Sequence, residues 1–254
     1  MSAFSPDHAG ATVRPSPNFG HRQGGFRPEI IILHYTGMET GPGAEDWLCN
    51  SASEVSSHYL VHENGRIVQM VREKYRAWHA GKSSWHGVTD INSQSIGIEI
   101  VNPGHSLGYV PFPKRQIGSV IELCQGITRR HKIRPEMVLG HSDVAVGRKI
   151  DPGEKFPWRV LARAGVGHFV APARHRSGRI LAFGDEGEAV AELQKLLRAY
   201  GYGIELSGRY DMLTQTVITA FQRHFRPSKV DGVADFATFE TLRKLLAAMG
   251  SNRS

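Results

Sequence analysis

The sequence predicts an α/β fold in which helices flank a mixed central sheet, followed by a small three-helix C-terminal domain. In the first part of the chain, short apolar runs of strand length alternate with segments of helical period. In the last part, residues 180–249, the patterns are helical. The chain has 254 residues, more than the usual size of one domain, which is about 100–200 residues, so two domains are expected.

Five short apolar runs have the length of strands. They lie at residues 30–33, 58–61, 66–70, 95–101 and 137–139. The pair Asn64-Gly65 is a turn signal that joins the second and third runs as a hairpin. The runs therefore supply the strands of one sheet.

Two segments between these runs have the pattern of helices. Residues 44–50 are predicted to form a short helix and residues 114–131 a long one. The apolar stripe of the long helix consists of Ile117, Val120, Ile121, Cys124 and Ile127. Residues 1–26, rich in proline, glycine and histidine, are predicted to be an extended arm that packs against the first domain or stays mobile.

The composition changes after Phe169, so the first domain is predicted to span residues 27–169. Residues 170–179 are predicted to be a linker. The second domain, residues 180–249, is built from three helical segments. They lie at residues 183–197, 211–224 and 235–249.

Two histidines end apolar runs: His34 follows Ile31-Ile-Leu, and His141 follows Met137-Val-Leu-Gly. Open α/β sheets place ligand sites beyond the carboxyl ends of their strands, where these two imidazoles could converge. Asp151, before Pro152, could join them, although by itself it would be an ordinary turn residue. Two imidazoles and one carboxylate are the ligands of a catalytic zinc site, whose fourth position stays open for water. The set predicts metal-assisted hydrolysis.

Several motifs occur together in a recognisable order. They are Leu33-His34-Tyr-Thr, Ser95-Ile-Gly-Ile-Glu99-Ile, Gly140-His141-Ser-Asp and Arg148-Lys149-Ile-Asp151-Pro-Gly. This set, over residues 27–166, resembles the zinc-dependent N-acetylmuramoyl-L-alanine amidases of the type 2 amidase family, which also includes the peptidoglycan recognition proteins. The resemblance implies the type 2 amidase fold for residues 27–169 and one Zn²⁺ ion bound by His34, His141 and Asp151. It also implies hydrolysis of the amide bond between N-acetylmuramic acid and L-alanine.

The resemblance assigns Glu99 and Lys149 to the catalytic group. Glu99 would act as general base toward water, and Lys149 would stabilise the oxyanion that forms when the amide is attacked. Taken alone, Lys149 would be a solvated surface cation. Glu99 alternates with isoleucines along its strand, so it would face away from the core and could line a cleft.

Further residues are candidates for contacting substrate, although each has an alternative structural role, which is favoured for Tyr59. They are His79, Trp78, Trp85, Asn102 and Tyr59. The two tryptophans could stack on sugar or peptide. Asn102 could donate a hydrogen bond to substrate or simply begin the Asn-Pro turn.

The second domain resembles the small three-helix peptidoglycan-binding domain. The matching positions are Gly187, Leu193-Gln194, Gly208, Thr214, Phe221-Gln222, Asp231-Gly232 and Thr238. The resemblance implies that this domain anchors the enzyme to its polymer and raises the local concentration of substrate. The alternative is a helical appendage that serves only packing.

Composition limits the partners. The net charge is +7 and the pI about 9.6, which favours polyanions. Because the basic residues are dispersed, nucleic acid is not expected, whereas anionic wall polymers and muropeptide carboxylates are. There is no apolar run of about 20 residues, so no transmembrane segment is expected. The oligomeric state is left open.

The N-terminus lacks the pattern of a secretory signal, so a cytoplasmic location is expected, with the periplasm or cell wall as the alternative. Cys49 and Cys124 are predicted to be buried thiols without a disulfide framework.

Two other functions remain open at this point. One is a noncatalytic peptidoglycan recognition protein, and the other is a zinc peptidase that cuts within the stem peptide. A binding module would need neither an open zinc site nor a base, so the presence of both Asp151 and Glu99 favours the amidase. The sequence leaves open whether the substrate is intact sacculus or 1,6-anhydro-muropeptide.

Overall fold

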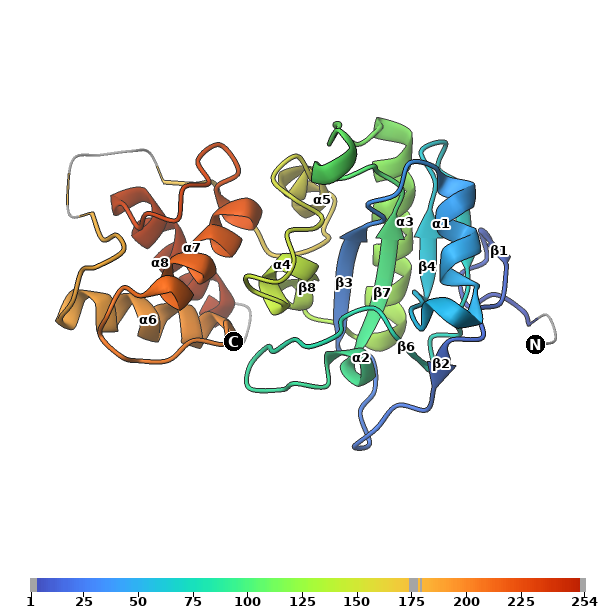
Figure 1. Cartoon of the computed structure of the whole chain (residues 1–254), viewed down its shortest axis with the longest axis horizontal. Coiled ribbons are helices and arrows are strands. Elements are labelled where there is room, and N and C mark those ends of the chain that lie inside the picture. Colours follow the sequence, from blue (N-terminus) through green and yellow to red (C-terminus); the bar gives the residue numbers. More distant parts are fainter. Residues whose placement is uncertain (1–3, 174–177, 179, 252–254) are drawn as a thin grey trace.

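A computed structural model describes residues 4–173, 178 and 180–251. Its main sheet has the strand order β1-β5-β4-β7-β3-β8 (Figure 1). These strands are β1 (Ala11–Val13), β3 (Ile30–Tyr35), β4 (Tyr59–Val61), β5 (Ile67–Gln69), β7 (Ser95–Ile100) and β8 (Val138–Gly140). Strands β4 and β5 form the predicted antiparallel hairpin, and the other neighbouring pairs are parallel, so the sheet is mixed as predicted.

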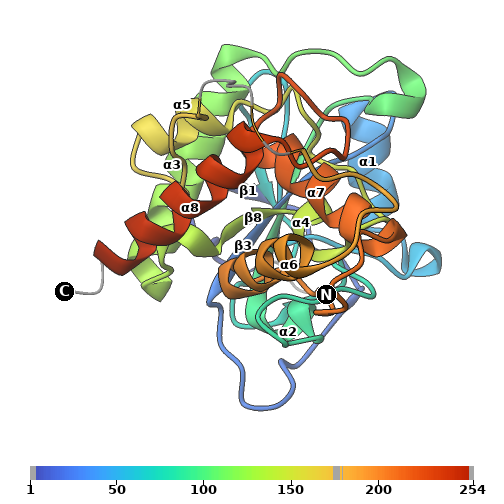
Figure 2. The same ribbon diagram turned by 90° about the vertical axis from the view of Figure 1, so that its left-hand side faces the viewer.

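Helices cover both faces of this sheet (Figures 1 and 2). On one face lies α3 (Lys114–His131), whose apolar stripe packs in the core with Ile96, Ile98 and Ile100 of β7. On the other lies α1 (Gly41–Leu48), which packs against the alternate residues of β4 and β5. Helix α1 begins earlier than predicted because Thr40 caps it and Pro42 fits its first turn.

Successive side chains of β7 point to opposite faces of the sheet, and this alternation determines where Glu99 lies. Because the isoleucines of β7 point toward α3, Glu99 points to the opposite face. The parallel register of β3 and β7 pairs His34 with Glu99. The sheet thus brings the two predicted site residues together.

Residues of the predicted N-terminal arm lie against the first domain. Strand β1 extends the sheet beside β5, and β2 (Phe19–Gly20) pairs with β6 (Arg76–Ala77) in a small second sheet. The sequence did not predict these strands, which are two or three residues long and have no clear apolar alternation.

Short helical turns connect the strands. They are η1 (Ser51–Ser53), α2 (Ile91–Gln94), η2 (His105–Leu107), η3 (Pro135–Met137), α4 (His141–Val144) and α5 (Trp158–Arg163). Helix α4 follows β8 directly, so His141 stands at the junction of strand and helix. Cys49 is half-buried, Cys124 is buried, and both are free thiols.

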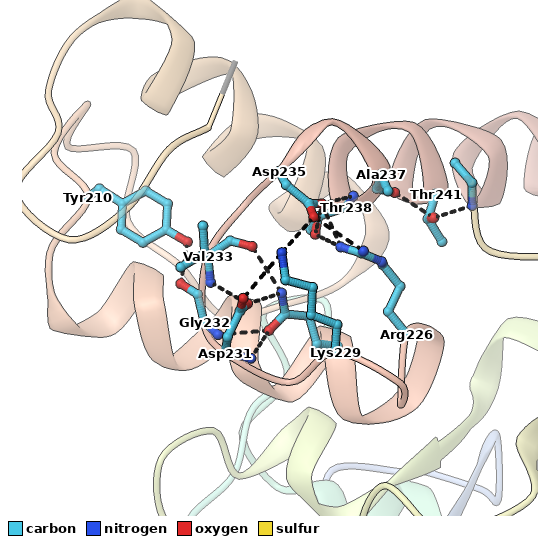
Figure 3. A network of polar contacts seen from close by, with 12 residues as sticks. Tyr210, Arg226, Lys229, Asp231, Gly232, Val233, Asp235, Ala237, Thr238 and Thr241 are labelled. Carbon is cyan, nitrogen blue, oxygen red and sulfur yellow. Dashed lines mark hydrogen bonds and ion pairs between the residues drawn. The ribbon is translucent and has the colours of Figure 1, made fainter. Parts of the chain in front are cut away.

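The C-terminal domain consists of α6 (Glu188–Tyr200), α7 (Met212–Phe225) and α8 (Phe236–Ser251). A polar network holds the turn between α7 and α8: Arg226 Nη1 lies 2.6 Å from Asp235 Oδ1, and Lys229 Nζ lies 3.1 Å from Asp235 Oδ2 (Figure 3). Residues 174–177 and 179 of the expected linker, 170–179, lie outside the described residues. No helix in the described part of the chain has the length and apolar character needed to cross a membrane.

The C-terminal domain packs against the β8 edge of the first domain (Figures 1 and 2). Helices α4 and α7 face each other there. Trp158 of the first domain stacks on His224 of α7, with ring centroids 3.7 Å apart. The edge strand β8 is therefore covered rather than open to solvent.

Candidate active site

His34, His141 and Asp151 meet beyond the carboxyl ends of β3 and β8. His34 Nδ1 lies 2.9 Å from His141 Nδ1, and both nitrogens lie 3.0 Å from Asp151 Oδ2. A metal ion bound tetrahedrally at about 2.0–2.1 Å holds its ligand atoms about 3.3 Å apart. Three buried donor atoms in such a triangle fit a metal ion of this kind.

The second ring nitrogen of each histidine has its own partner, which decides which nitrogen is left for a metal. His141 Nε2 donates to the carbonyl of Ala80 at 3.0 Å, which leaves Nδ1 with a lone pair. His34 Nε2 lies 3.0 Å from His79 Nδ1, and His79 Nε2 lies 3.2 Å from Ser95 Oγ. His79 therefore supports a predicted metal ligand.

The charge states of the cluster also suit a metal. Burial lowers the pKa of His34 to about 4, and the neighbouring His141 adds to this effect. Burial alone would raise the pKa of Asp151, but the two imidazoles outweigh it and hold that pKa well below its ordinary value. At neutral pH His34 is neutral and Asp151 ionised, and these are the forms that coordinate metal ions.

Glu99 faces the same cluster from β7. Its Oε2 is buried and has no hydrogen-bond partner among the described residues. Burial raises the pKa of Glu99 well above its ordinary value, Asp151 raises it further, and the Lys149 ammonium opposes the shift. A buried carboxylate oxygen without a partner needs an explanation, and a proton-transfer role supplies one.

The cluster opens into a cavity of about 460 Å³. His34, Glu99, His141, Lys149 and Asp151 all line it, so the structure brings the predicted metal and catalytic groups to one cavity. Lys149 itself is exposed. Trp78 and His79 line the same cavity, as the sequence suggested for substrate contacts.

Three residues expected to contact substrate are not among the residues that line this cavity. Their polar atoms or ring surfaces contact other parts of the protein. Tyr59 is fully buried on the α3 side and donates its hydroxyl to Glu73 at 2.8 Å. Asn102 bonds Val110 O and Gly104 N, which shapes its own turn. Trp85 packs against Tyr200 and Tyr202 of the C-terminal domain. These contacts support a structural role for the three residues, and their contact with substrate stays a prediction.

Sequence reasoning missed two residues that line the cavity. Trp47, on α1, is 49% exposed there, and only its place on a short amphipathic helix hinted at it. Arg148 donates to the carbonyls of Ala80 and Lys82 and so holds the loop that bonds His141. Beside Lys149 in the sequence, Arg148 resembled a second solvated cation.

Known protein families match both domains of the chain. A family model described as N-acetylmuramoyl-L-alanine amidase matches residues 24–154, and a peptidoglycan binding domain model matches residues 186–242. The chain is 39% identical over 247 residues to the N-acetylmuramoyl-L-alanine amidase AmiD of Escherichia coli, covering 89% of this chain and 85% of AmiD.

Two solved structures extend the similarity to the whole fold. Escherichia coli AmiD in complex with anhydro-N-acetylmuramic acid-L-Ala-D-gamma-Glu-L-Lys matches with a TM-score of 0.75 and 36% identity, over 90% of this chain and 92% of AmiD. AmpDh3 of Pseudomonas aeruginosa, in complex with an anhydromuramic pentapeptide, matches with a TM-score of 0.72 and 29% identity, over 93% and 96%. The predicted fold class is confirmed, and the chain belongs to the N-acetylmuramoyl-L-alanine amidase family.

Proposed function

We propose that this amidase uses one Zn²⁺ ion, bound by His34, His141 and Asp151, to hydrolyse the bond between N-acetylmuramic acid and L-alanine. The observation that carries the proposal is the triangle of donor atoms about 3 Å apart, with the unpartnered Glu99 Oε2 facing it. When bound, zinc supplies a Lewis acid and lowers the pKa of a bound water to about 7.

The protein's own groups account for the proton transfers. Glu99 accepts a proton from the water that attacks the amide carbonyl, and then delivers it to the nitrogen of L-alanine as the C–N bond breaks. Its raised pKa, caused first by burial, suits a group that must both take and release a proton. The Lys149 ammonium, at the cavity wall, stabilises the negative charge that develops on the carbonyl oxygen.

We infer that the walls of the cavity bind the sugar and the stem peptide. Trp47 and Trp78 offer apolar surfaces on which a sugar ring can stack. The complexes of AmiD and AmpDh3 contain anhydro-muramyl peptides, which favours such fragments as substrates of this chain. The C-terminal domain favours a polymeric substrate as well, because tethering raises the local concentration of wall.

The test is mass spectrometry of products from a soluble anhydro-muramyl peptide and from polymeric peptidoglycan, with and without a chelator. We expect free stem peptides that begin with L-alanine, and we expect the chelator to abolish their release. Cuts within the stem peptide would indicate a peptidase instead. Binding without any cleavage would indicate a recognition protein and would refute the proposal.

A further inference from the structure

Asp143 is a fully buried carboxylate two residues after the predicted metal ligand His141. Its oxygens have partners from both domains. Oδ2 accepts the N–H of Gly140 at 2.8 Å and lies 2.7 Å from His224 Nδ1, while Oδ1 accepts the hydroxyl of Tyr202 at 2.8 Å. Since His224 and Tyr202 belong to the C-terminal domain, that domain supplies two of the three partners that Asp143 has among the described residues.

Aromatic packing fixes these two partners in place. The His224 ring stacks on Trp158 of the first domain, with the ring planes inclined by 21°. Tyr202 packs edge-on against Trp85, with centroids 4.9 Å apart. Both side chains are buried, so their contacts with Asp143 at the joint between the domains are shielded from water.

Hydrogen bonds connect Asp143, at this joint between the domains, to the predicted metal ligands. Helix α4 is a single turn that begins at His141. Asp143 accepts the N–H of Gly140, just before this turn, and the N–H of Ser142, within the turn, donates to the carbonyl of Asp151 at 2.9 Å. A shift of Asp143 would therefore move the α4 turn, which carries the predicted ligand His141 and donates a hydrogen bond to the backbone of the predicted ligand Asp151.

We propose that the C-terminal domain positions His141 through Asp143, with Tyr202 and His224 as positioning residues. The domain is then part of the metal site as well as an anchor. This inference rests on the proposed metal site. Withdrawing the donors would leave a buried carboxylate poorly paired, which is costly enough to displace the α4 turn. The effect should reach small soluble substrates, which do not need an anchor.

The test uses full-length chains with Tyr202→Phe, His224→Phe and both together. Phenylalanine keeps the ring packing and removes the polar group. Tyr210→Phe is the matched control, because Tyr210 is a buried tyrosine of the same domain whose hydroxyl donates to Gly232 O, away from the joint (Figure 3). His224→Asn is the rescue variant, since its amide can donate from about the position of Nδ1.

The first readout is the dissociation constant for zinc, measured by competition with a chromophoric chelator. Loss of groups that support metal ligands typically weakens metal binding 10–100-fold. We expect the double variant to bind zinc 10–100-fold more weakly than wild type and Tyr210→Phe to bind it equally well. His224→Asn should recover part of the zinc affinity that His224→Phe loses. On a soluble anhydro-muramyl peptide we expect kcat to fall while KM changes little.

Zinc affinity within twofold of wild type in the double variant, with its circular dichroism unchanged, would overturn the inference. If the double variant does not fold, Tyr202→Phe alone decides by the same criterion. Because zinc binding is measured without substrate, it is independent of the proposed reaction. A wild-type chain that binds zinc and leaves the muropeptide intact would refute the proposed function and leave this test standing.

Discussion

At the level of single residues, the site depends on which face of a strand each side chain occupies. His34 and Glu99 pair across β3 and β7, and both point away from the α3 core. For Glu99 the alternation with isoleucines made this orientation predictable. His34 ends a continuous apolar run, which indicates the end of a strand but not the face on which the side chain lies. The partners that prepare the site, such as His79 for His34, come from loops, and no sequence period indicates those contacts.

Replacing Glu99 by glutamine should abolish proton transfer and leave the metal ligands intact. The amide is nearly the same size but cannot accept the proton, so we expect kcat to fall about 10²–10⁴-fold. The zinc content, measured by atomic absorption, should equal that of wild type, whereas His141→Ala should lose the metal. Near-normal turnover by Glu99→Gln would rule out Glu99 as the base.

A second prediction concerns Glu73, which lies outside the site and is 4% exposed. Burial alone would raise its pKa, but hydrogen bonds from His131, Arg130 and Tyr59 outweigh burial and lower it from 4.5 to about 2. A lowered carboxyl pKa stabilises the fold above the unfolded-state pKa, and this contribution disappears as the pH falls from 4.5 to 2. The difference corresponds to about 3 kcal/mol.

We therefore expect Glu73→Gln to lower the free energy of unfolding by about 3 kcal/mol at pH 7 and by much less near pH 2. Urea denaturation at both pH values measures this change. Glu122→Gln, on the exposed side of α3, serves as the control and should alter little. An equal loss at both pH values would show that the ionised carboxylate is not the source of the stability.

At the level of elements, the predictable part of the fold was the part with a regular period. Helix α3 has the predicted bounds because its apolar stripe spans the whole segment. Strands β3, β4, β5, β7 and β8 lie within two residues of their predictions. Strands β1 and β2 were missed because their pairing is fixed by partners more than 50 residues away. The packing of Trp85 against the C-terminal domain could not be predicted, because an aromatic loop residue has the same local pattern in a cleft and in an interface.

The end of α6 offers a test of the interface. Gly201 has φ +136°, and an added Cβ would lie 2.5 Å from Trp85 Cε2, across the joint. Gly201→Ala therefore combines backbone strain with a collision, together about 2–4 kcal/mol. Gly184→Ala is the matched control, because Gly184 has φ +97° and an added Cβ there would have no neighbouring atom within 4 Å.

Thermal unfolding should show a larger fall in Tm for Gly201→Ala than for Gly184→Ala, by roughly 5 °C or more. Tryptophan fluorescence is a suitable probe, because Trp85 and Trp158 both lie at the joint. Equal Tm values for the two variants would mean that the domains separate easily, which would also weaken the case for positioning through Asp143.

At the scale of the whole molecule, the proposed function combines two modes of substrate recognition in one chain. We infer that the cavity selects a single amide bond by contact, whereas the C-terminal domain and the net charge of +7 act on the polymer as a whole. The sequence predicted both units but not how they join. Asp143 and His224 are 81 residues apart, and the sequence around each of them gives no indication that they are in contact.

The charge leads to a prediction about salt. Attraction between exposed charges is screened within about 8 Å at physiological ionic strength and within about 3 Å at 1 M, so binding to an anionic wall should weaken as salt rises. We expect the fraction of protein that sediments with sacculi carrying anionic polymers to fall severalfold between about 0.05 and 0.5 M NaCl. Sacculi stripped of those polymers should show a smaller change. Hydrolysis of a soluble muropeptide, which depends on contacts inside a 460 Å³ cavity, should change least. Binding that does not depend on salt would place wall recognition in the C-terminal domain's own contacts rather than in the charge of the chain.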